Sequence, residues 1–135
     1  MEDELVIQRI IEKMYHSITC DRDKKQDWDG FRSVFHSNAI LIEYHRPRNK
    51  IISVETYIEE MRSVFCVYPE IIVHGFREEE TESKLYINMN NAYSVSTYRK
   101  QYMLNSRKFD VIGENYIQLI RENDEWRIFS IMWNE

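Results

Sequence analysis

The spacing of apolar residues changes about halfway along this 135-residue chain. In the first half they recur at helical spacing. In the second half, segments rich in Val, Ile, Tyr, Phe and Thr follow one another with only short polar turns between them. Parallel βαβ units would need helices between these later strands, so consecutive strands joined by short turns favour an antiparallel arrangement. The sequence therefore predicts one α+β domain over residues 1–135, in which N-terminal helices lie across a curved antiparallel sheet.

The first helix is expected over residues 5–18. Its apolar residues lie three or four positions apart and share one helical face. They are Ile7, Ile10, Ile11, Met14 and Ile18. Acidic residues precede them, which suits the positive end of the helix dipole, and the polar stretch 19–27 that follows is predicted to be a loop.

Two further helices have recognisable ends. Asp27 or Asp29 can cap a short second helix around Phe31. Ser53 is a suitable N-cap for a third helix, and Pro69 prevents that helix from continuing.

The remaining apolar segments are predicted to be strands. They cover residues 38–44, 50–52, 71–76, 92–103, 109–122 and 126–133. The first two are expected to pair with each other, and the later three or four to form an antiparallel meander. The acidic run 78–82 is interpreted as a solvated strand end or loop that keeps a sheet edge from unwanted pairing.

Charge and motifs exclude several classes of function. The net charge of −5 arises from interspersed acidic and basic residues, so no basic face for nucleic acid or anionic lipid is expected. The N-terminus is acidic and no apolar run approaches the roughly 20 residues of a membrane span, which favours a cytoplasmic protein with no membrane partner. Cys20 and Cys66 have no CxxC spacing and are expected to be free thiols, and the histidine spacing suggests no metal site.

Four short pieces, in order along nearly the whole chain, carry a family resemblance. They are Trp28-Asp29-Gly30-Phe31 with Val34-Phe35, the strand Ala39-Ile40-Leu41-Ile42-Glu43, Asn91-Ala92 leading to Ser96-Thr97-Tyr98, and the ending Trp126-Arg127-Ile128 with Trp133. Together they resemble the nuclear transport factor 2-like (NTF2-like) superfamily, which includes the SnoaL-like polyketide cyclases.

That resemblance implies a cone, in which a bent sheet curls around three helices and leaves a pocket between its concave face and the first and third helices. Many members of the superfamily form homodimers through the convex face of the sheet. In strand 92–103, both faces are uncharged along most of their length, which is consistent with a face covered by helices and a face covered by a second subunit.

Glu43 is the first candidate catalytic residue. It ends an aliphatic strand, and the resemblance to ketosteroid isomerases places a proton-abstracting carboxylate at the corresponding position. A carboxylate at the pocket mouth could act as a general base. The alternative is a strand-end glutamate that faces water.

Two more residues are candidates through the resemblance. Tyr15 resembles in position the tyrosine that donates a hydrogen bond to the oxyanion in those isomerases, although it could be ordinary packing. His74 resembles the pocket histidine of dehydratase and cyclase members and could form an acid/base pair with Glu43, although it could equally be a core or an exposed histidine. The isomerases' second oxyanion donor is an aspartic acid, whereas this chain has Gly113 to Asn115 in that region, which counts against steroid isomerase activity itself.

Four residues are predicted to line the pocket, although each could instead be ordinary core: Tyr57, Tyr98, Asn115 and Trp133. Two functions remain open on this basis. One is a cofactor-independent isomerase, cyclase or dehydratase that abstracts a proton next to a carbonyl of a small apolar substrate. The other is a non-catalytic homodimeric module that binds a small ligand or serves assembly. An open pocket with converging polar groups would favour the first, and an interior filled by side chains the second.

Overall fold

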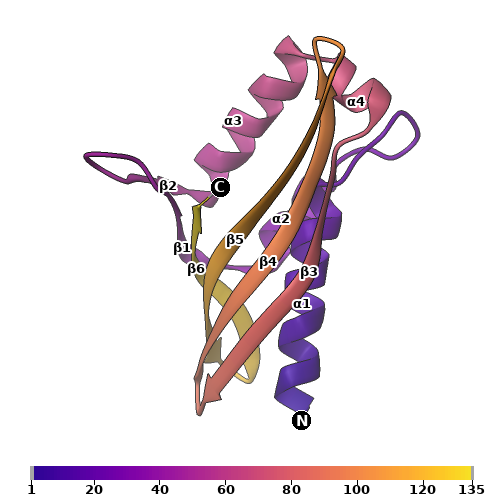
Figure 1. Cartoon of the computed structure of the whole chain (residues 1–135). Helices are drawn as coiled ribbons and strands as arrows, with labels where there is room; N and C mark the ends of the chain where they lie inside the picture. Colours follow the sequence, from indigo (N-terminus) through magenta and orange to yellow (C-terminus); the bar gives the residue numbers. More distant parts are fainter. Residues whose placement is uncertain (1, 135) are drawn as a thin grey trace.

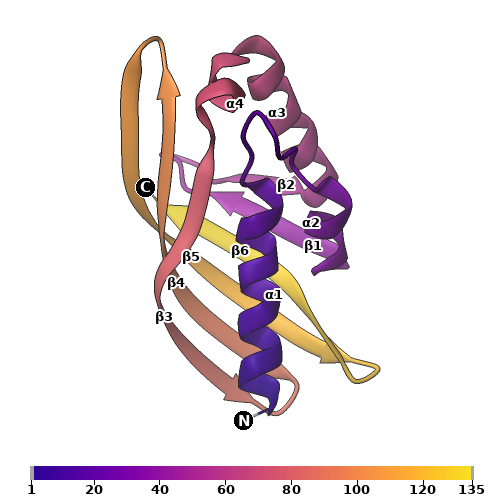
Figure 2. The same ribbon diagram turned by 90° about the vertical axis from the view of Figure 1, so that its right-hand side faces the viewer.

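A computed structural model describes residues 2–134 as four helices and a six-stranded sheet (Figure 1). The helices are α1 (Glu2–Ile18), α2 (Trp28–Ser33), α3 (Val54–Val67) and α4 (Glu70–His74). The strands are β1 (Phe35–Glu43), β2 (Lys50–Ser53), β3 (Arg77–Asn88), β4 (Asn91–Leu104), β5 (Arg107–Glu122) and β6 (Glu125–Asn134). The sheet curves and the helices lie on its concave side (Figure 2), so the predicted α+β cone is confirmed.

Helix α1 forms and packs as its sequence pattern predicts. Three acidic residues occupy its first turn, where they complement the helix dipole. The side chains of Ile7, Ile11, Met14 and Ile18 are buried against the sheet. Figure 2 shows the helix lying across the concave face, and its strongest strand contacts are with β3.

Both predicted helix caps are present. The Asp27 carboxylate accepts a hydrogen bond from the Gly30 N–H at 2.9 Å and begins α2. The Ser53 hydroxyl accepts one from the Thr56 N–H at 3.1 Å and begins α3. Each cap satisfies an N–H group that has no partner within its own helix. Helix α3 then ends shortly before Pro69, as expected.

The sheet has the order β2-β1-β6-β5-β4-β3 and is mixed. Strands β3 to β6 form an antiparallel meander, while β1 runs antiparallel to β2 and parallel to β6. The predicted meander and the predicted pairing of the first two strands are both confirmed. The parallel contact places the start of the sheet beside the end of the chain, so residues about 90 positions apart come together at one site.

Two stretches differ from the prediction. Residues 71–76 were expected to form a strand, but they fall mainly in α4. Pro69 has a helical φ of −61° and no N–H that needs a partner, so it can precede a helix, and Gly75 ends that helix with a φ of 93°. The acidic run 78–82 was expected to be a strand end or loop, but it lies within β3. The high charge of this segment concealed the strand.

The two faces of the sheet differ in exposure. On β4, Ser94, Ser96 and Tyr98 point toward the helices and are almost completely buried. Their neighbours point outward, and Tyr93 remains 43% exposed beside Tyr86, its partner on β3. The core and any enclosed site therefore lie on the concave side. None of the helices in residues 2–134 is long and apolar enough to span a membrane.

Candidate functional site

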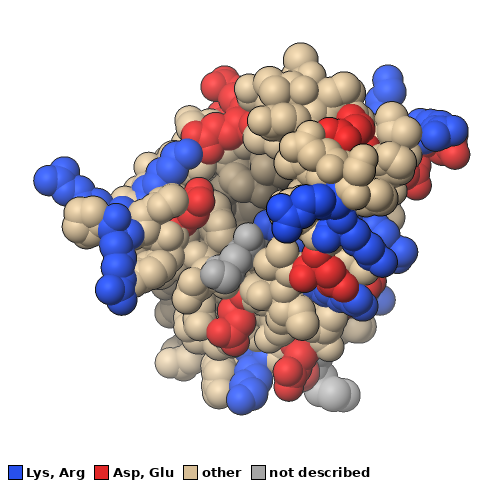
Figure 3. Space-filling model, turned by 45° about the horizontal axis from the view of Figure 1, so that its top comes forward, with Lys and Arg blue, Asp and Glu red and all other residues tan. Residues whose placement is uncertain are grey.

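A cavity of about 360 Å³ lies between the concave face of the sheet and helices α1, α3 and α4. Figure 3 shows its mouth as a hollow with acidic and basic side chains on the rim. Most of the lining is apolar and includes Met14, Ile18, Phe31, Leu41, Met61, Phe65, Ile71, Phe76 and Ile131. A cavity of this size, with few polar groups, is typical of a small-molecule site.

The polar groups of the cavity are organised by strand register. Glu43 on β1 pairs with Trp133 on β6, Trp133 pairs with Asn115 on β5, and Asn115 pairs with Ser96 on β4. These four residues form one row across the concave face. Since adjacent strands are about 4.8 Å apart, the backbones of Glu43 and Asn115 are separated by about 10 Å.

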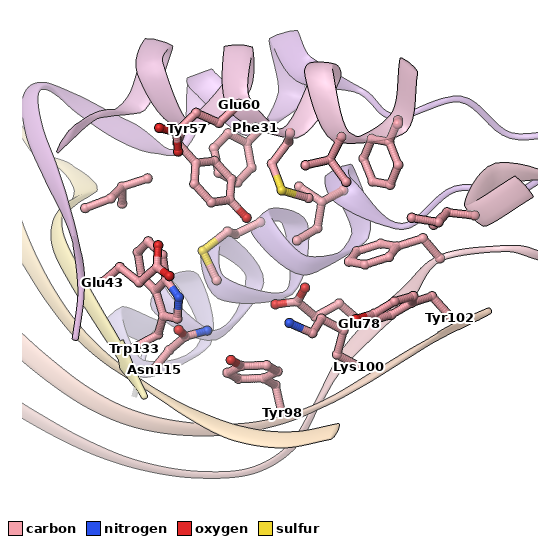
Figure 4. Close-up of a pocket in the computed structure, with 18 of the residues that line it drawn as sticks. Phe31, Glu43, Tyr57, Glu60, Glu78, Tyr98, Lys100, Tyr102, Asn115 and Trp133 are labelled. Atoms are coloured by element: carbon pink, nitrogen blue, oxygen red, sulfur yellow. The ribbon is translucent and has the colours of Figure 1, made fainter. Parts of the chain in front are cut away.

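Glu43 lines the cavity at its mouth (Figure 4). Its side chain is 36% exposed, and its Oε1 lies 3.1 Å from Nε2 of His45. The sequence suggested His74 as the imidazole partner of Glu43. In the structure His74 is exposed at the end of α4 and does not line the cavity, because the segment that carries it is helical. The neighbouring imidazole is instead that of His45, which the sequence reasoning did not select.

A second ion pair lies at the same mouth. The Lys50 ammonium is 2.6 Å from the Glu60 carboxylate, and Glu60 also lines the cavity. The hydrogen bond that Lys50 donates to Glu60 raises the pKa of Lys50. Both partners are more than 40% exposed, so this pair contributes little to stability.

Glu78 and Lys100 lie on the wall formed by β3 and β4. They are directly opposite each other in the β3–β4 register, and both line the cavity (Figure 4). Sequence reasoning missed Glu78 because the acidic run was interpreted as a strand end or loop, and it therefore gave Lys100, in the predicted strand 92–103, no partner. An available signal was the alternation along this run, in which Glu78 and Glu80 face inward and Glu79 faces solvent.

Tyr15 lies behind the cavity lining rather than in it. Its hydroxyl is 2.7 Å from the Ser96 hydroxyl and accepts a hydrogen bond from the Asn115 amide at 2.9 Å. Burial raises the pKa of Tyr15 strongly, and the two hydrogen bonds offset this only in part, so the side chain remains a neutral phenol. The hydroxyl predicted to face an oxyanion is therefore engaged within the protein.

The four predicted ligand-binding residues Tyr57, Tyr98, Asn115 and Trp133 all line the cavity (Figure 4). Tyr57 stacks on Phe31 with ring centroids 5.6 Å apart and meets the edge of Trp133 at 5.9 Å. These contacts fix the aromatic wall in a geometry that leaves the cavity open.

Tyr98 depends on a neighbouring glycine. Gly113 lies directly opposite it on β5, and a Cβ at Gly113 would be 2.5 Å from the Tyr98 hydroxyl oxygen and 2.6 Å from Cζ. The absence of a side chain at Gly113 therefore makes room for the Tyr98 ring. In the region where the isomerases carry an aspartic acid, this chain has Gly113, which leaves space for the Tyr98 ring.

No group of three or more His, Cys, Asp or Glu side chains in residues 2–134 is arranged to hold a metal ion. Of the two cysteines, Cys20 is buried and Cys66 is exposed, and neither forms a disulfide.

The curved mixed sheet with helices on its concave side defines the NTF2-like class of folds, and comparison with solved structures confirms the resemblance at the level of the fold. The chain is similar to a hexachlorocyclohexane dehydrochlorinase, LinA-type3, from Novosphingobium barchaimii, with a TM-score of 0.77 and 11% identity over 98% of this chain and 86% of that one. It is also similar to an NTF2-like protein of unknown function from Pseudomonas putida, with a TM-score of 0.73 and 11% identity over 98% and 86% of the two chains.

A third similar structure is a scytalone dehydratase-like protein from Novosphingobium aromaticivorans. Its TM-score is 0.72 at 9% identity, over 98% of this chain and 83% of that one. No protein-family model matches the chain. No curated protein matches it by sequence either. At such low identities the similarity establishes the fold and leaves the function to be argued from the site.

Proposed function

We propose that the cavity binds a small, largely apolar molecule, and that Glu43 removes a proton from a carbon next to a carbonyl group without a cofactor. The observation that carries this proposal is an open cavity of about 360 Å³ whose mostly apolar lining includes the Glu43 carboxylate. An interior filled by side chains would have favoured a structural role. The similar structures named as a dehydrochlorinase and a scytalone dehydratase-like protein lend support.

The chemistry needs a base and a hydrogen-bond donor. Glu43 accepts the proton, the C–H electron pair forms a carbon–carbon double bond, and the carbonyl π electrons move to oxygen to give an enolate. Trp133 is the neighbour of Glu43 in the row, and its indole N–H can donate to that oxygen. In a substrate with a carbon–carbon double bond next to that carbon, the enolate is conjugated, and return of the proton from Glu43 to the far end of that double bond completes an isomerisation. His45 would act as a positioning residue for Glu43.

The proposal can be tested without a known substrate. A panel of small cyclic ketones is incubated in D₂O, and loss of the α-proton signal is followed by NMR. The protein is expected to accelerate exchange, and Glu43→Gln to slow it at least about 100-fold with the fold intact. Glu59→Gln is the matched control, since Glu59 is exposed on α3 and does not line the cavity. Equal rates in the protein and Glu43→Gln would remove Glu43 from the mechanism.

The second candidate function is non-catalytic binding of the same kind of molecule. Two observations favour it: Glu43 is one-third exposed, and no histidine among residues 2–134 lines the cavity. Binding of a ketone without any exchange of its α-protons would select this function over catalysis.

We also propose that the protein forms a homodimer through the outer face of the sheet. This face carries exposed apolar side chains, including Tyr86 at 62% and Tyr93 at 43%, beside a groove that Tyr116 and Met132 also line. Burial of such a patch would stabilise association. Native mass spectrometry is expected to show a dimer that Tyr93→Glu converts to a monomer, and a monomer before mutation would contradict the proposal.

A further inference from the structure

A series of hydrogen bonds connects Glu80 on β3 to Asn115 in the cavity lining. Gln8 donates to one oxygen of Glu80 at 2.6 Å, and Ser96 donates to the other. The Ser96 hydroxyl is 2.7 Å from that of Tyr15, which in turn accepts from the Asn115 amide at 2.9 Å. Asn115 lines the cavity, whereas the other members lie behind its lining.

Helix α1 and three strands bring these hydrogen-bonded residues together. Gln8 and Tyr15 are seven residues apart on α1 and therefore point from the same face of the helix toward the sheet. Glu80 and Ser96 lie on the adjacent strands β3 and β4, and Ser96 pairs directly with Asn115 on β5. Tyr15 and Ser96 are 2% or less exposed, so water does not compete for their hydrogen bonds.

The donors and acceptors of these hydrogen bonds can be arranged in only one order. A carboxylate only accepts hydrogen bonds, and Glu80 accepts from both Gln8 and Ser96. Because the single Ser96 hydroxyl proton is given to Glu80, the proton between Ser96 and Tyr15 must come from Tyr15. The Tyr15 oxygen can then only accept from Asn115, so the amide nitrogen, and not the amide oxygen, faces Tyr15.

This order settles which way the Asn115 amide is turned. With its nitrogen committed to Tyr15, the carbonyl oxygen Oδ1 is the acceptor left for the cavity. The amide nitrogen donates to Tyr15, which lies behind the lining, while Asn115 itself lines the cavity.

We infer that Glu80 and Ser96 are positioning residues that, through Tyr15, hold Asn115 with its carbonyl oxygen toward the cavity, so that the bound molecule is recognised by a hydroxyl or N–H group. This inference rests on the proposed binding function and narrows its ligand class. The hydroxyl or N–H group of the ligand lies over Asn115, about two strands away from Glu43. The rest of the ligand is apolar. A ligand that offers only acceptors at that end would leave the Asn115 oxygen unpaired.

The test compares two probes of similar size, 4-propylphenol and 4-propylanisole, by titration calorimetry. The phenol carries a hydroxyl donor and the methyl ether does not. The protein is expected to bind the phenol roughly tenfold more tightly. In Ser96→Ala, Tyr15 can donate to Asn115 instead, the amide turns over, and the ratio of the two affinities is expected to fall toward one.

Ser94→Ala is the matched control. Ser94 lies on the same face of β4 two residues away, is equally buried, and its hydroxyl has no hydrogen-bond partner in the structure. This variant should keep the tenfold ratio. If Ser96 has only a structural role, Ser96→Ala would weaken the binding of both probes equally and leave the ratio of their affinities unchanged. That result would overturn the inference. A ratio near one before mutation would overturn it as well.

A second readout separates this inference from the proposed function. Nuclear Overhauser contacts between the Asn115 amide protons and the Tyr15 ring protons report the amide orientation without a ligand. They are expected in the protein and in Ser94→Ala, and they should weaken in Ser96→Ala. If neither probe binds but these contacts behave as expected, the proposed function fails and the positioning role stands. If the contacts are absent from the protein before mutation, the positioning role fails.

Discussion

Glu43 and Glu80 are both glutamates on the concave side of the sheet, but their surroundings differ. Glu43 lies at the cavity mouth, one-third exposed, with the His45 imidazole as its neighbour. Glu80 accepts hydrogen bonds from Gln8 and Ser96 and ends a chain that passes through buried Tyr15. In the proposed function the mouth meets the ligand and exchanges protons, whereas the hydrogen-bond network of Glu80, Ser96 and Tyr15 holds Asn115 in place. Loss of a network residue should therefore cost more stability than loss of a mouth residue.

The largest effect is expected for Tyr15→Phe. This change removes the donor to the Ser96 oxygen and the acceptor of the Asn115 amide, and Ser96 keeps only its bond to Glu80. The free energy of unfolding should fall by about 3 kcal/mol. Chemical denaturation measures this value, with Tyr68→Phe as the control because Tyr68 is 41% exposed and lies outside the proposed dimer face. Equal losses in the two variants would mean that the network adds no stability.

A somewhat smaller effect is expected for Gly113→Ala. The added Cβ would lie 2.5 Å from the Tyr98 hydroxyl oxygen, so the Tyr98 ring must move and the strands must adjust. A loss of about 2 kcal/mol is expected from this overpacking. Ile112→Ala, at an adjacent position that is 70% exposed, should change stability far less. A stable Gly113→Ala protein with an unmoved Tyr98 would show that the glycine is not needed.

Alkaline pH should distinguish the buried network from the mouth. Burial raises the pKa of Tyr15 above its value in the unfolded chain, so the folded state holds its proton more tightly. The stability that Tyr15 contributes is fully present below about pH 10 and is lost as the pH rises further, by up to about 1.4 kcal/mol per pH unit. Unfolding measured from pH 9 to pH 11 should show this decline, and Tyr15→Phe should lack it. Parallel curves for the two proteins would contradict the assignment.

The smallest effect is expected at the mouth. His45→Gln removes the imidazole beside Glu43, but the His45 side chain is 50% exposed. Stability should change by no more than about 0.5 kcal/mol. Thermal unfolding can measure this difference, and a loss as large as that of Tyr15→Phe would remove the contrast between the mouth and the network.

Much of the fold could be predicted from local sequence. The apolar face of α1, the caps Asp27 and Ser53, and the strands of the meander depend on neighbouring residues, and the structure has them as expected. Strand β3 was missed because inward-facing Glu78 and Glu80 reverse the usual pattern of apolar residues inside. Helix α4 was missed because a short apolar run does not distinguish a helix from a strand.

The site was predicted less completely, for a physical reason. The family resemblance suggested Glu43 as a pocket residue, and the side-chain types of Asn115 and Trp133 suggested them as pocket lining. Their alignment in one row depends on the pairing of β1 with β6, which joins opposite ends of the chain and cannot be read from local patterns. The same limit applies to the Tyr15 hydroxyl, whose partners lie 81 and 100 residues away.

Binding of a ligand in the cavity can be measured directly at the three tryptophans. Trp133 lines the cavity, whereas the indole N–H of Trp126 donates to Asp3 at 3.1 Å and Trp28 is buried in α2. When 4-propylphenol is titrated and followed by ¹H–¹⁵N NMR, the Trp133 indole signal and the Asn115 amide signal should shift saturably while the other two indole signals stay in place. Unchanged Trp133 and Asn115 signals at saturating probe would contradict ligand binding in the cavity.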